Sequence, residues 1–246
     1  MKLILTIIFV LTIFTNRAFA QESIYLYKDG AVVGEFEIAN IDSITFYRQV
    51  HGTVEDIEGN EYNTVVIGTQ NWMAESLRTT TYDDETSIPI VTDKIIWQNI
   101  TVGACCWNNN DPDSYKETYG ALYNWKVIES NKICPSGWHV PTVTEWNTLI
   151  EYLGGKDIAG GKLKMTNLWL DPNSGASNES GLSVKPSGYR HEGEFGGISE
   201  SAVFWSSSIN YDAPYYFTLD YERENIIEID LSTIVADGFS VRCIED

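Results

Sequence analysis

Short stretches in which apolar and polar residues alternate occur at both ends of this 246-residue chain, and such alternation is typical of half-buried β-strands. Residues 24–28 and 31–38 are two of them, and residues 29–30 between them are an Asp-Gly pair. Such a pair favours a type I′ turn, because both central residues of that turn need positive φ. Residues 43–47 alternate as a third strand would, so a small β element is predicted over residues 21–49.

The spacing changes to that of an amphipathic helix at residues 143–153. Thr142 and Glu145 form a T-x-x-E pattern, which satisfies free backbone donors at a helix start. The apolar residues that follow lie three or four apart and form one face: Trp146, Leu149, Ile150 and Leu153. A glycine pair at 154–155 suits the left-handed end of this helix.

The other elements are predicted from shorter signals. We expect a helix over residues 119–129, a helix from Asp157 to Leu163, and a polar, irregular loop over residues 79–118. Further short strands are expected at residues 52–54, 62–67, 204–206, 215–219, 225–230 and 238–244.

The first twenty residues have the pattern of a secretory signal peptide. Lys2 gives a basic start, residues 3–15 are almost wholly apolar, and residues 18–20 are Ala-Phe-Ala. About a dozen apolar residues are too few for a membrane-spanning helix, which needs about 20. We therefore expect residues 1–20 to be removed and the rest to be exported to the periplasm, the cell surface or the medium. No later stretch is apolar and long enough to predict a membrane span.

The charge of the chain is strongly acidic. The full sequence has 16 Lys+Arg and 35 Asp+Glu; removing Lys2 and Arg17 leaves 14 basic residues against 35 acidic ones, a formal charge of −21. Nucleic acids and anionic membrane surfaces repel such a field, so neither is an expected partner.

Four cysteines remain in the expected mature chain: Cys105, Cys106, Cys134 and Cys243. An oxidising compartment allows disulfides, and four cysteines allow three pairings. Neighbouring cysteines rarely bond to each other because that geometry is strained. We favour Cys134–Cys243, which leaves Cys105 and Cys106 as thiols, or one of them paired elsewhere. No Cys-x-x-Cys or Cys/His cluster indicates a zinc site.

From residue 52 onward, short motifs follow one another in an order that covers nearly the whole of residues 50–246. They are residues 52–54, 66–68, 70–75, 77–78, 106–107, 109–111, 119–125, 134–141, 145–146, 153–155, 161–163, 178–181, 188–190, 204–207 and 240–244. In this order they resemble the Fibrobacter succinogenes major paralogous domain. The resemblance implies an exported protein of the Bacteroidetes and Fibrobacter kind and brings no activity with it. At position 105 the family pattern leads us to expect an aromatic residue, and this chain has Cys105 instead.

A fainter likeness concerns the fold. Residues 137–146 are similar to the helix entry of the formylglycine-generating-enzyme group, and residues 238–242 are similar to its closing strand. This likeness implies a C-type-lectin-like fold. We therefore expect an α+β protein: a C-type-lectin-like domain of short helices, short antiparallel strands and long loops, preceded by a small β-hairpin element.

The known patterns of catalytic chemistry are missing from the sequence. It contains no G-x-S-x-G, no H-E-x-x-H and no phosphate-binding loop. The three histidines, His51, His139 and His191, lie far apart, and His139 between two apolar residues is interpreted as a packed core residue. The oxidase chemistry of the lectin-like enzymes needs a cysteine pair near the end of the chain, where only Cys243 lies.

Two places combine aromatic rings with hydrogen-bonding groups in a way that suits sugars. Trp107 is followed by Asn108 and Asn109, and Tyr189 is followed by Arg190. The C–H face of a sugar stacks on an aromatic ring while amide groups bond its hydroxyls. Core packing is the competing interpretation for each aromatic residue, because these rings bury a large area.

The polar stretch of residues 108–117 offers oxygen ligands of the kind that calcium prefers. Asp111 and Asp113 are the first candidate ligands, so calcium is a candidate cofactor. The stretch lacks the fixed spacing of a known calcium loop, and Asn, Asp and Pro also simply form turns.

These observations favour an exported, non-enzymatic binding or adhesion module whose partner is a polysaccharide or another cell-surface component. Two alternatives stay open. One is a hydrolase of exported polymers that uses two carboxylates, since 35 acidic residues offer many pairs. The other is a purely structural surface protein.

Overall fold

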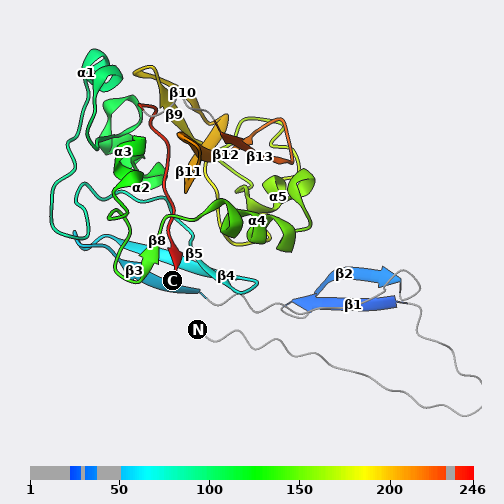
Figure 1. The fold of residues 1–246 in the computed structure, drawn as a ribbon. Helices are drawn as coiled ribbons and strands as arrows, with labels where there is room; N and C mark the ends of the chain where they lie inside the picture. The colour runs from blue at the N-terminus through cyan, green and yellow to red at the C-terminus, as the bar shows by residue number, and fades with distance from the viewer. Residues whose placement is uncertain (1–22, 29–30, 38–50, 231–235) are drawn as a thin grey trace, which may run out of the picture. The chain divides into compact units, whose positions relative to one another are not determined.

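The chain divides into two units, residues 1–48 and residues 49–246, and each is taken by itself. The computed structural model describes residues 23–28, 31–37, 51–230 and 236–246 (Figure 1). The predicted signal peptide, residues 1–20, and the predicted third strand, residues 43–47, lie outside the described residues. Within the described part, no helix has the length and apolar character needed to cross a membrane.

The described part of the first unit is an antiparallel hairpin of β1 (Ser23–Lys28) and β2 (Ala31–Glu37). The pairing runs from Ser23 opposite Glu37 to Lys28 opposite Ala31, as predicted for strands on either side of the Asp-Gly pair. The Tyr25 hydroxyl donates a hydrogen bond to Glu35 across the two strands at 2.7 Å.

The second unit contains two five-stranded sheets. The first has the order β3-β4-β5-β14-β8 and is antiparallel throughout. Its strands are β3 (His51–Glu55), β4 (Glu61–Ile67), β5 (Gln70–Met73), β8 (Trp138–His139) and β14 (Ile244–Glu245). The end of the chain therefore lies inside this sheet, between β5 and β8, and β8 forms one edge.

The second sheet has the order β10-β9-β11-β12-β13. Its strands are β9 (Ser187–His191), β10 (Glu194–Ile198), β11 (Ser201–Asn210), β12 (Ala213–Asp220) and β13 (Ile226–Asp230). All neighbours are antiparallel except β9 and β11, which meet in parallel where Ala202 lies opposite Gly188. A separate pair joins β6 (Cys105–Cys106) to β7 (Leu122–Tyr123).

The predicted capping box is confirmed at the start of α4 (Val143–Tyr152). The Thr142 hydroxyl accepts a hydrogen bond from the Glu145 backbone N–H at 3.3 Å, and the Glu145 carboxylate accepts one from the Thr142 N–H at 2.7 Å. Gly154 has a φ of 100°, the left-handed conformation expected at the helix end. The second helix, α5 (Lys156–Leu163), has Asp157 in its first turn rather than as its cap.

The helix predicted over residues 119–129 is only partly right, because residues 120–124 are not helical. The structure has the end of one helix, the strand β7 and the short helix α3 (Trp125–Glu129) there. Gly120 breaks the helix: its φ is 77°, and a Cβ at this position would lie 2.6 Å from the carbonyl oxygen of Leu77. The spacing of three between apolar residues in this region reflects two separate elements, both of which contribute to the core.

The loop predicted over residues 79–118 is also partly wrong, because it contains α1 (Lys94–Asn99), the 3-10 helix η2 (Asn108–Asn110) and α2 (Pro112–Tyr119). Asp93 and Asp111 cap α1 and α2, each accepting a backbone N–H three residues further on. An aspartate followed by a proline at the first helical position is a start signal for α2 that was present in the sequence.

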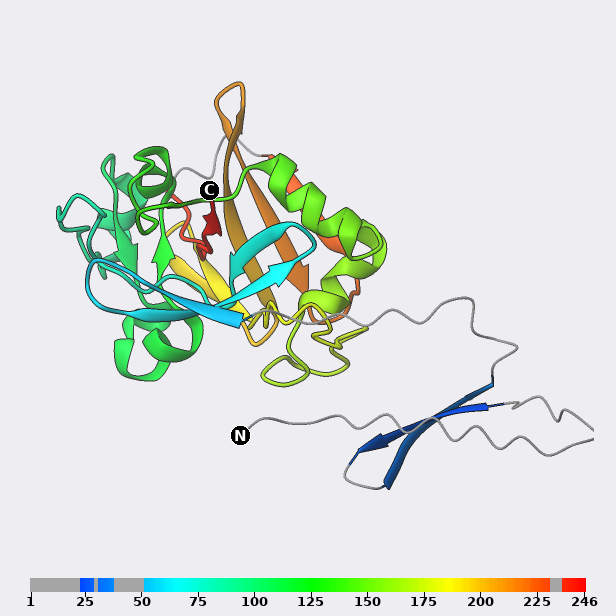
Figure 2. The ribbon, with the colours of Figure 1, turned by 90° about the horizontal axis from the view of Figure 1, so that it is seen from below.

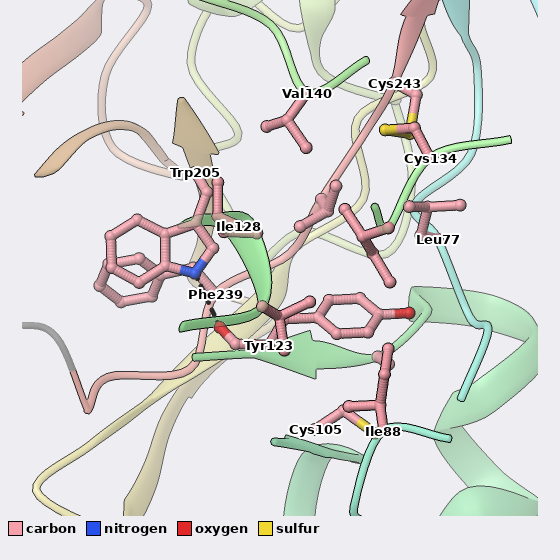
Figure 3. Packing of buried hydrophobic residues seen from close by; sticks show 14 of the residues in the cluster. Leu77, Ile88, Cys105, Tyr123, Ile128, Cys134, Val140, Trp205, Phe239 and Cys243 are labelled. Carbon is pink, nitrogen blue, oxygen red and sulfur yellow. Dashed lines mark hydrogen bonds between the residues drawn. A yellow bond between two sulfur atoms is a disulfide. The ribbon is translucent and has the colours of Figure 1, made fainter. Parts of the chain in front are cut away.

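A first core surrounds Trp205 (Figure 3). The Trp205 indole N–H donates a hydrogen bond to the carbonyl oxygen of Tyr123 at 2.7 Å, and its ring lies 4.4 Å from that of Phe239 and 5.5 Å from that of Trp125. The predicted disulfide between Cys134 and Cys243 is confirmed and lies within this core.

A second core surrounds Trp146 on α4. Its ring lies 4.9 Å from Trp72 of β5 and 4.9 Å from Phe217 of β12, so one helix contacts both sheets. Figure 2 shows α4 and α5 lying alongside the strands of the second sheet. The observed architecture is a mixed α+β fold with several short helices and antiparallel sheets.

Replacing both bonded cysteines, as Cys134→Ala with Cys243→Ala, should lower the free energy of unfolding. The bond closes a loop with a sequence separation of 109 residues. Restricting the unfolded chain over a loop of that size contributes about 3–5 kcal/mol. Urea unfolding of the oxidised protein and the double variant measures the difference.

Thiol titration provides the control. Cys105 and Cys106 are buried thiols, and burial raises the pKa of both, that of Cys106 to about 12. The native protein should therefore show no reactive thiol, and the protein in denaturant without reductant should show two. Four thiols in denaturant, or an unchanged urea midpoint in the double variant, would contradict the disulfide.

Candidate functional site

The asparagine run 108–110 forms the turn η2, which packs against β9 and β10. Trp107 and Asn108 are buried, and the Asn108 side chain donates a hydrogen bond to the carbonyl oxygen of Ser187 at 2.9 Å. Asn109 and Asn110 are exposed, with φ values of 53° and 56°. Asparagine tolerates this left-handed conformation better than most residues, so the sequence fits the turn.

Arg190 is a scaffold residue in the structure, not a surface group. It is 1% exposed, and its guanidinium donates hydrogen bonds to the carbonyl oxygens of Gly193, Val91 and Thr92 at 3.1, 2.6 and 2.9 Å. The same group lies 4.4 Å from the ring centre of Trp97. Arg190 and Asn108, both predicted to contact a ligand, are therefore committed to holding backbone segments together, and Trp107 is packed inside.

We use the name tyrosine surface for four residues of η2, α2 and β9 that remain at least partly accessible: Asn109, Tyr115, Tyr119 and Tyr189. The Asn109 amide donates a hydrogen bond to the Tyr115 hydroxyl at 3.2 Å, and the rings of Tyr115 and Tyr119 lie 5.8 Å apart. Burial raises the pKa of Tyr119, whose hydroxyl interacts with the Ser199 side chain just after β10. All three tyrosines are half-buried.

Tyr189 lies against the glycines of β10. A Cβ added to Gly197 would lie 2.8 Å from Cε1 of Tyr189, and one added to Gly196 would lie 3.3 Å from the ring. The ring therefore lies against a stretch of backbone without side chains, and these glycines are what allows it to do so. Asn109 and Tyr189 thus lie on the neighbouring elements η2 and β9. The sequence did not single out Tyr115 or Tyr119.

The two predicted calcium ligands serve the start of α2. The Asp111 carboxylate accepts a hydrogen bond from the Ser114 backbone N–H at 3.1 Å, and contacts with Ser114 hold the pKa of Asp111 below its usual range. Asp113 is exposed in the first helical turn. Over the described residues, no group of three or more His, Cys, Asp or Glu side chains is placed to hold a metal ion. A calcium site here stays a prediction.

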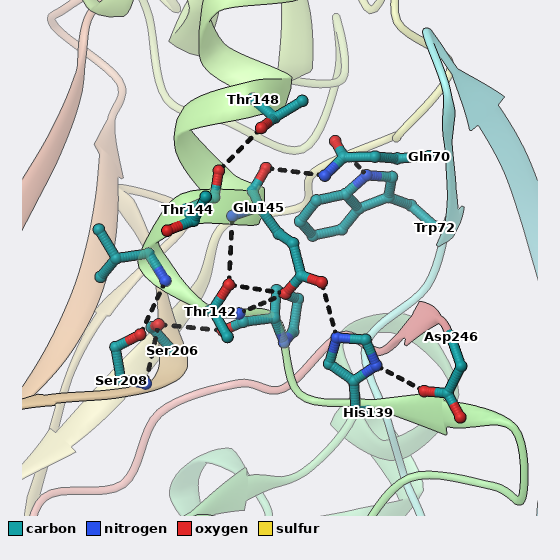
Figure 4. A network of polar contacts seen from close by, with 12 residues as sticks. Gln70, Trp72, His139, Thr142, Thr144, Glu145, Thr148, Ser206, Ser208 and Asp246 are labelled. Carbon is teal, nitrogen blue, oxygen red and sulfur yellow. Dashed lines mark hydrogen bonds and ion pairs between the residues drawn. The ribbon is translucent and has the colours of Figure 1, made fainter.

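His139 was interpreted from the sequence as a packed core residue, and this interpretation is wrong. Its side chain is 38% exposed, because β8 is the edge strand of its sheet. Its Nδ1 lies 2.7 Å from the Asp246 carboxylate, and its Nε2 lies 2.8 Å from the Glu145 carboxylate (Figure 4). Partial burial alone would lower the pKa of His139, but the hydrogen bonds with Asp246 and Glu145 outweigh it and raise the pKa.

This histidine lacks the surroundings of a catalytic base. Both ring nitrogens are occupied by carboxylates, and Glu145 also caps α4. The nearby serines are committed elsewhere, since the Ser206 hydroxyl donates to the carbonyl oxygen of Pro141 and the Ser208 hydroxyl accepts from the Val143 N–H. Instead, these contacts hold the end of the chain against the start of α4. We call the group of His139, Asp246 and Glu145 the His139 clasp.

Comparison with known proteins identifies the family. The model of the Fibrobacter succinogenes major domain matches residues 65–245, which is most of the chain. The chain belongs to this family. The match begins within β4 and includes the later strands of both sheets, His139, Glu145 and the tyrosine surface; it ends one residue before Asp246. No curated protein and no solved structure matches the chain.

The His139 clasp predicts a pH-dependent stability. Since the folded-state pKa is raised above that of the unfolded chain, about 6.5, the stabilisation is fully present below that pH and is lost as pH rises through the folded pKa. The variant His139→Gln should therefore be destabilised more at about pH 6 than at about pH 8. Urea unfolding of both proteins at the two pH values measures this difference.

Asp246→Asn is the matched control, because it leaves the capping box intact and removes one of the two carboxylates. In that background the pH dependence of the His139→Gln effect should shrink. An equal destabilisation of His139→Gln at both pH values would show that folding does not raise the pKa of His139.

Proposed function

We propose that this protein is an exported, non-enzymatic binding module that holds carbohydrate on the tyrosine surface. The observation that carries the proposal is that the exposed Asn109 amide and the half-buried rings of Tyr115 and Tyr119 lie together, beside the strand β9 that carries half-buried Tyr189. They come from η2, α2 and β9, which are up to about eighty positions apart in the sequence.

The chemistry of this face suits a sugar. An aromatic ring that already packs against the protein loses little conformational entropy when a ligand stacks on it. More of the free energy of the stacking contact is then available for binding. Tyr189 is held in this way by the glycines of β10, and Tyr115 is held by Asn109 and Tyr119. The tyrosine hydroxyls and the amide offer both donors and acceptors for sugar hydroxyls.

The charge of the protein narrows the class of carbohydrate. The formal charge of the whole sequence is −19, and an acidic field of this size repels anionic polymers. A neutral polysaccharide or glycan is therefore the preferred partner.

The export and the fold belong to the same proposal. A signal peptide over residues 1–20 would bring the protein to an oxidising compartment, where a disulfide such as Cys134–Cys243 persists. Short helices beside antiparallel strands, with the end of the chain inside a sheet, are consistent with a C-type-lectin-like arrangement.

Replacing Tyr115 or Tyr189 by alanine should weaken binding to a neutral polysaccharide about tenfold or more, as expected for an aromatic residue at the centre of an interface. Asn109→Asp, which keeps a residue tolerant of positive φ, should weaken it as well. Tyr211→Ala is the control, because Tyr211 is a 93% exposed tyrosine outside this surface. Isothermal titration against the polysaccharide selected from a glycan array provides the measurement.

Three results would count against the proposal. No binding across plant, host and bacterial polysaccharides would favour a purely structural surface protein. Release of reducing ends, abolished by one Asp or Glu substitution, would favour a carboxylate-dependent hydrolase. Equal losses in Tyr189→Ala and Tyr211→Ala would place the binding elsewhere.

A further inference from the structure

A cavity of about 340 Å³ lies beside the disulfide, away from the residues of the tyrosine surface. Its lining comes from two turns: Asp83 and Asp84 form one wall, and residues 131–138 form most of the rest. The cavity opens to solvent and is bordered by charged, amide, hydroxyl and aromatic groups together. A concave place that joins an aromatic residue with a few polar groups is where a small ligand is first sought.

The backbone around this cavity is fixed before any ligand arrives. The Asp83 N–H donates a hydrogen bond to the carbonyl oxygen of Lys132 at 2.8 Å, which joins the two turns. The Trp138 N–H donates to the carbonyl oxygen of Pro135 at 2.9 Å, and Cys134 is bonded to Cys243. Ordering costs on binding should therefore be small.

The charges at the cavity leave one carboxylate uncommitted. The Lys132 ammonium lies 2.7 Å from the Asp84 carboxylate, and contacts with Lys132 and Thr86 lower the pKa of Asp84 to about 2. These two charges compensate each other. Asp83 is exposed, and within the described residues no hydrogen bond or ion pair engages its carboxylate. The cavity thus carries one net negative charge, at Asp83.

Trp138 supplies an aromatic wall. Trp138 borders the cavity, and its half-buried side chain packs against the first core, which holds the ring in place. Ser136 and Asn131, both exposed, line the same cavity and carry a hydroxyl and an amide. An aromatic ring with nearby hydroxyl and amide groups can stack on a sugar and bond its hydroxyls, and a carboxylate adds a partner for a cation.

We infer that this cavity binds one residue of an amino sugar whose amine is free. The ammonium group pairs with Asp83, the C–H face of the ring stacks on Trp138, and the hydroxyls bond Ser136 and Asn131. N-acetylation removes the positive charge and with it the pairing to Asp83, so the site distinguishes the free amine from the acetylated sugar. This site is separate from the tyrosine surface and does not depend on the proposed function.

The test is a titration of the exported chain, residues 21–246, with a β-1,4-linked glucosamine trimer, measured by isothermal titration calorimetry. The N-acetylated trimer and the glucose trimer are the matched ligands without the positive charge. We expect the glucosamine trimer to bind at least about tenfold more tightly than either, the size of one charge-assisted hydrogen bond. Equal binding of all three trimers, or no binding at millimolar concentration, would overturn the assignment.

Two substitutions decide whether the contact is local. Asp83→Asn should weaken glucosamine binding about tenfold, while Asp212→Asn, which removes an equally exposed charge from the β11–β12 turn, should leave it unchanged. Equal losses in the two variants would show attraction by the overall acidic field alone. Trp138→Phe should keep part of the affinity that Trp138→Ala loses; identical affinities in these two variants would exclude stacking on residue 138.

Tyr189→Ala separates this site from the tyrosine surface. It should leave glucosamine binding intact even where it abolishes binding of a neutral polysaccharide. Loss of both would place the two ligands in one site and refute the cavity assignment, whereas loss of the neutral polysaccharide alone agrees with two sites.

Discussion

The last segment of the chain, residues 236–246, is the constraint on which the rest of the second unit depends. Its backbone pairs in turn with β9, β7, β11, β5 and β8, so it contacts both five-stranded sheets and the small β6–β7 pair. The bond between Cys134 and Cys243 and the clasp of His139 on Asp246 fasten it at its end. Both cores contain side chains from this segment, so neither closes without it.

Buried cations reinforce this arrangement. The guanidinium of Arg242 donates to the carbonyl oxygens of Met73, Leu182 and Ser183, and the Lys164 ammonium donates to those of Asp220 and Arg223. Burial lowers the pKa of Arg242 to about 9 and that of Lys164 to about 8. Burying a charged group costs free energy unless its hydrogen-bond donors are satisfied. The carbonyl groups of several loops therefore bond these two side chains, and this fixes the positions of the irregular segments.

The sequence predicted candidate ligand residues but not which of them are exposed. An aromatic ring followed by an amide or a guanidinium indicated sugar chemistry at Trp107–Asn109 and at Tyr189–Arg190, and the structure brings these two places together. Which members face outward could not be predicted. Two carbonyl partners of Arg190 lie 98 and 99 positions away in the sequence, so its burial is invisible to any local pattern. Tyr115 and Tyr119 were missed because most of α2 was predicted as a loop and Tyr119 was assigned to a different, following helix.

The sequence by itself determined the features that depend on neighbouring residues: the N-terminal hairpin, the capped helix α4 and most strands of the second sheet. It also determined the order of motifs that indicates the family. The Cys134–Cys243 pair was favoured from the sequence, but the strain between adjacent cysteines excludes only a Cys105–Cys106 bond and leaves the other pairings open. Only the tertiary structure decided the sheet order, the exposed position of His139, the tyrosine surface and the cavity at Trp138. Each of these is made by residues far apart in the chain, and their contacts arise when both cores close, which no local spacing of polar and apolar residues specifies.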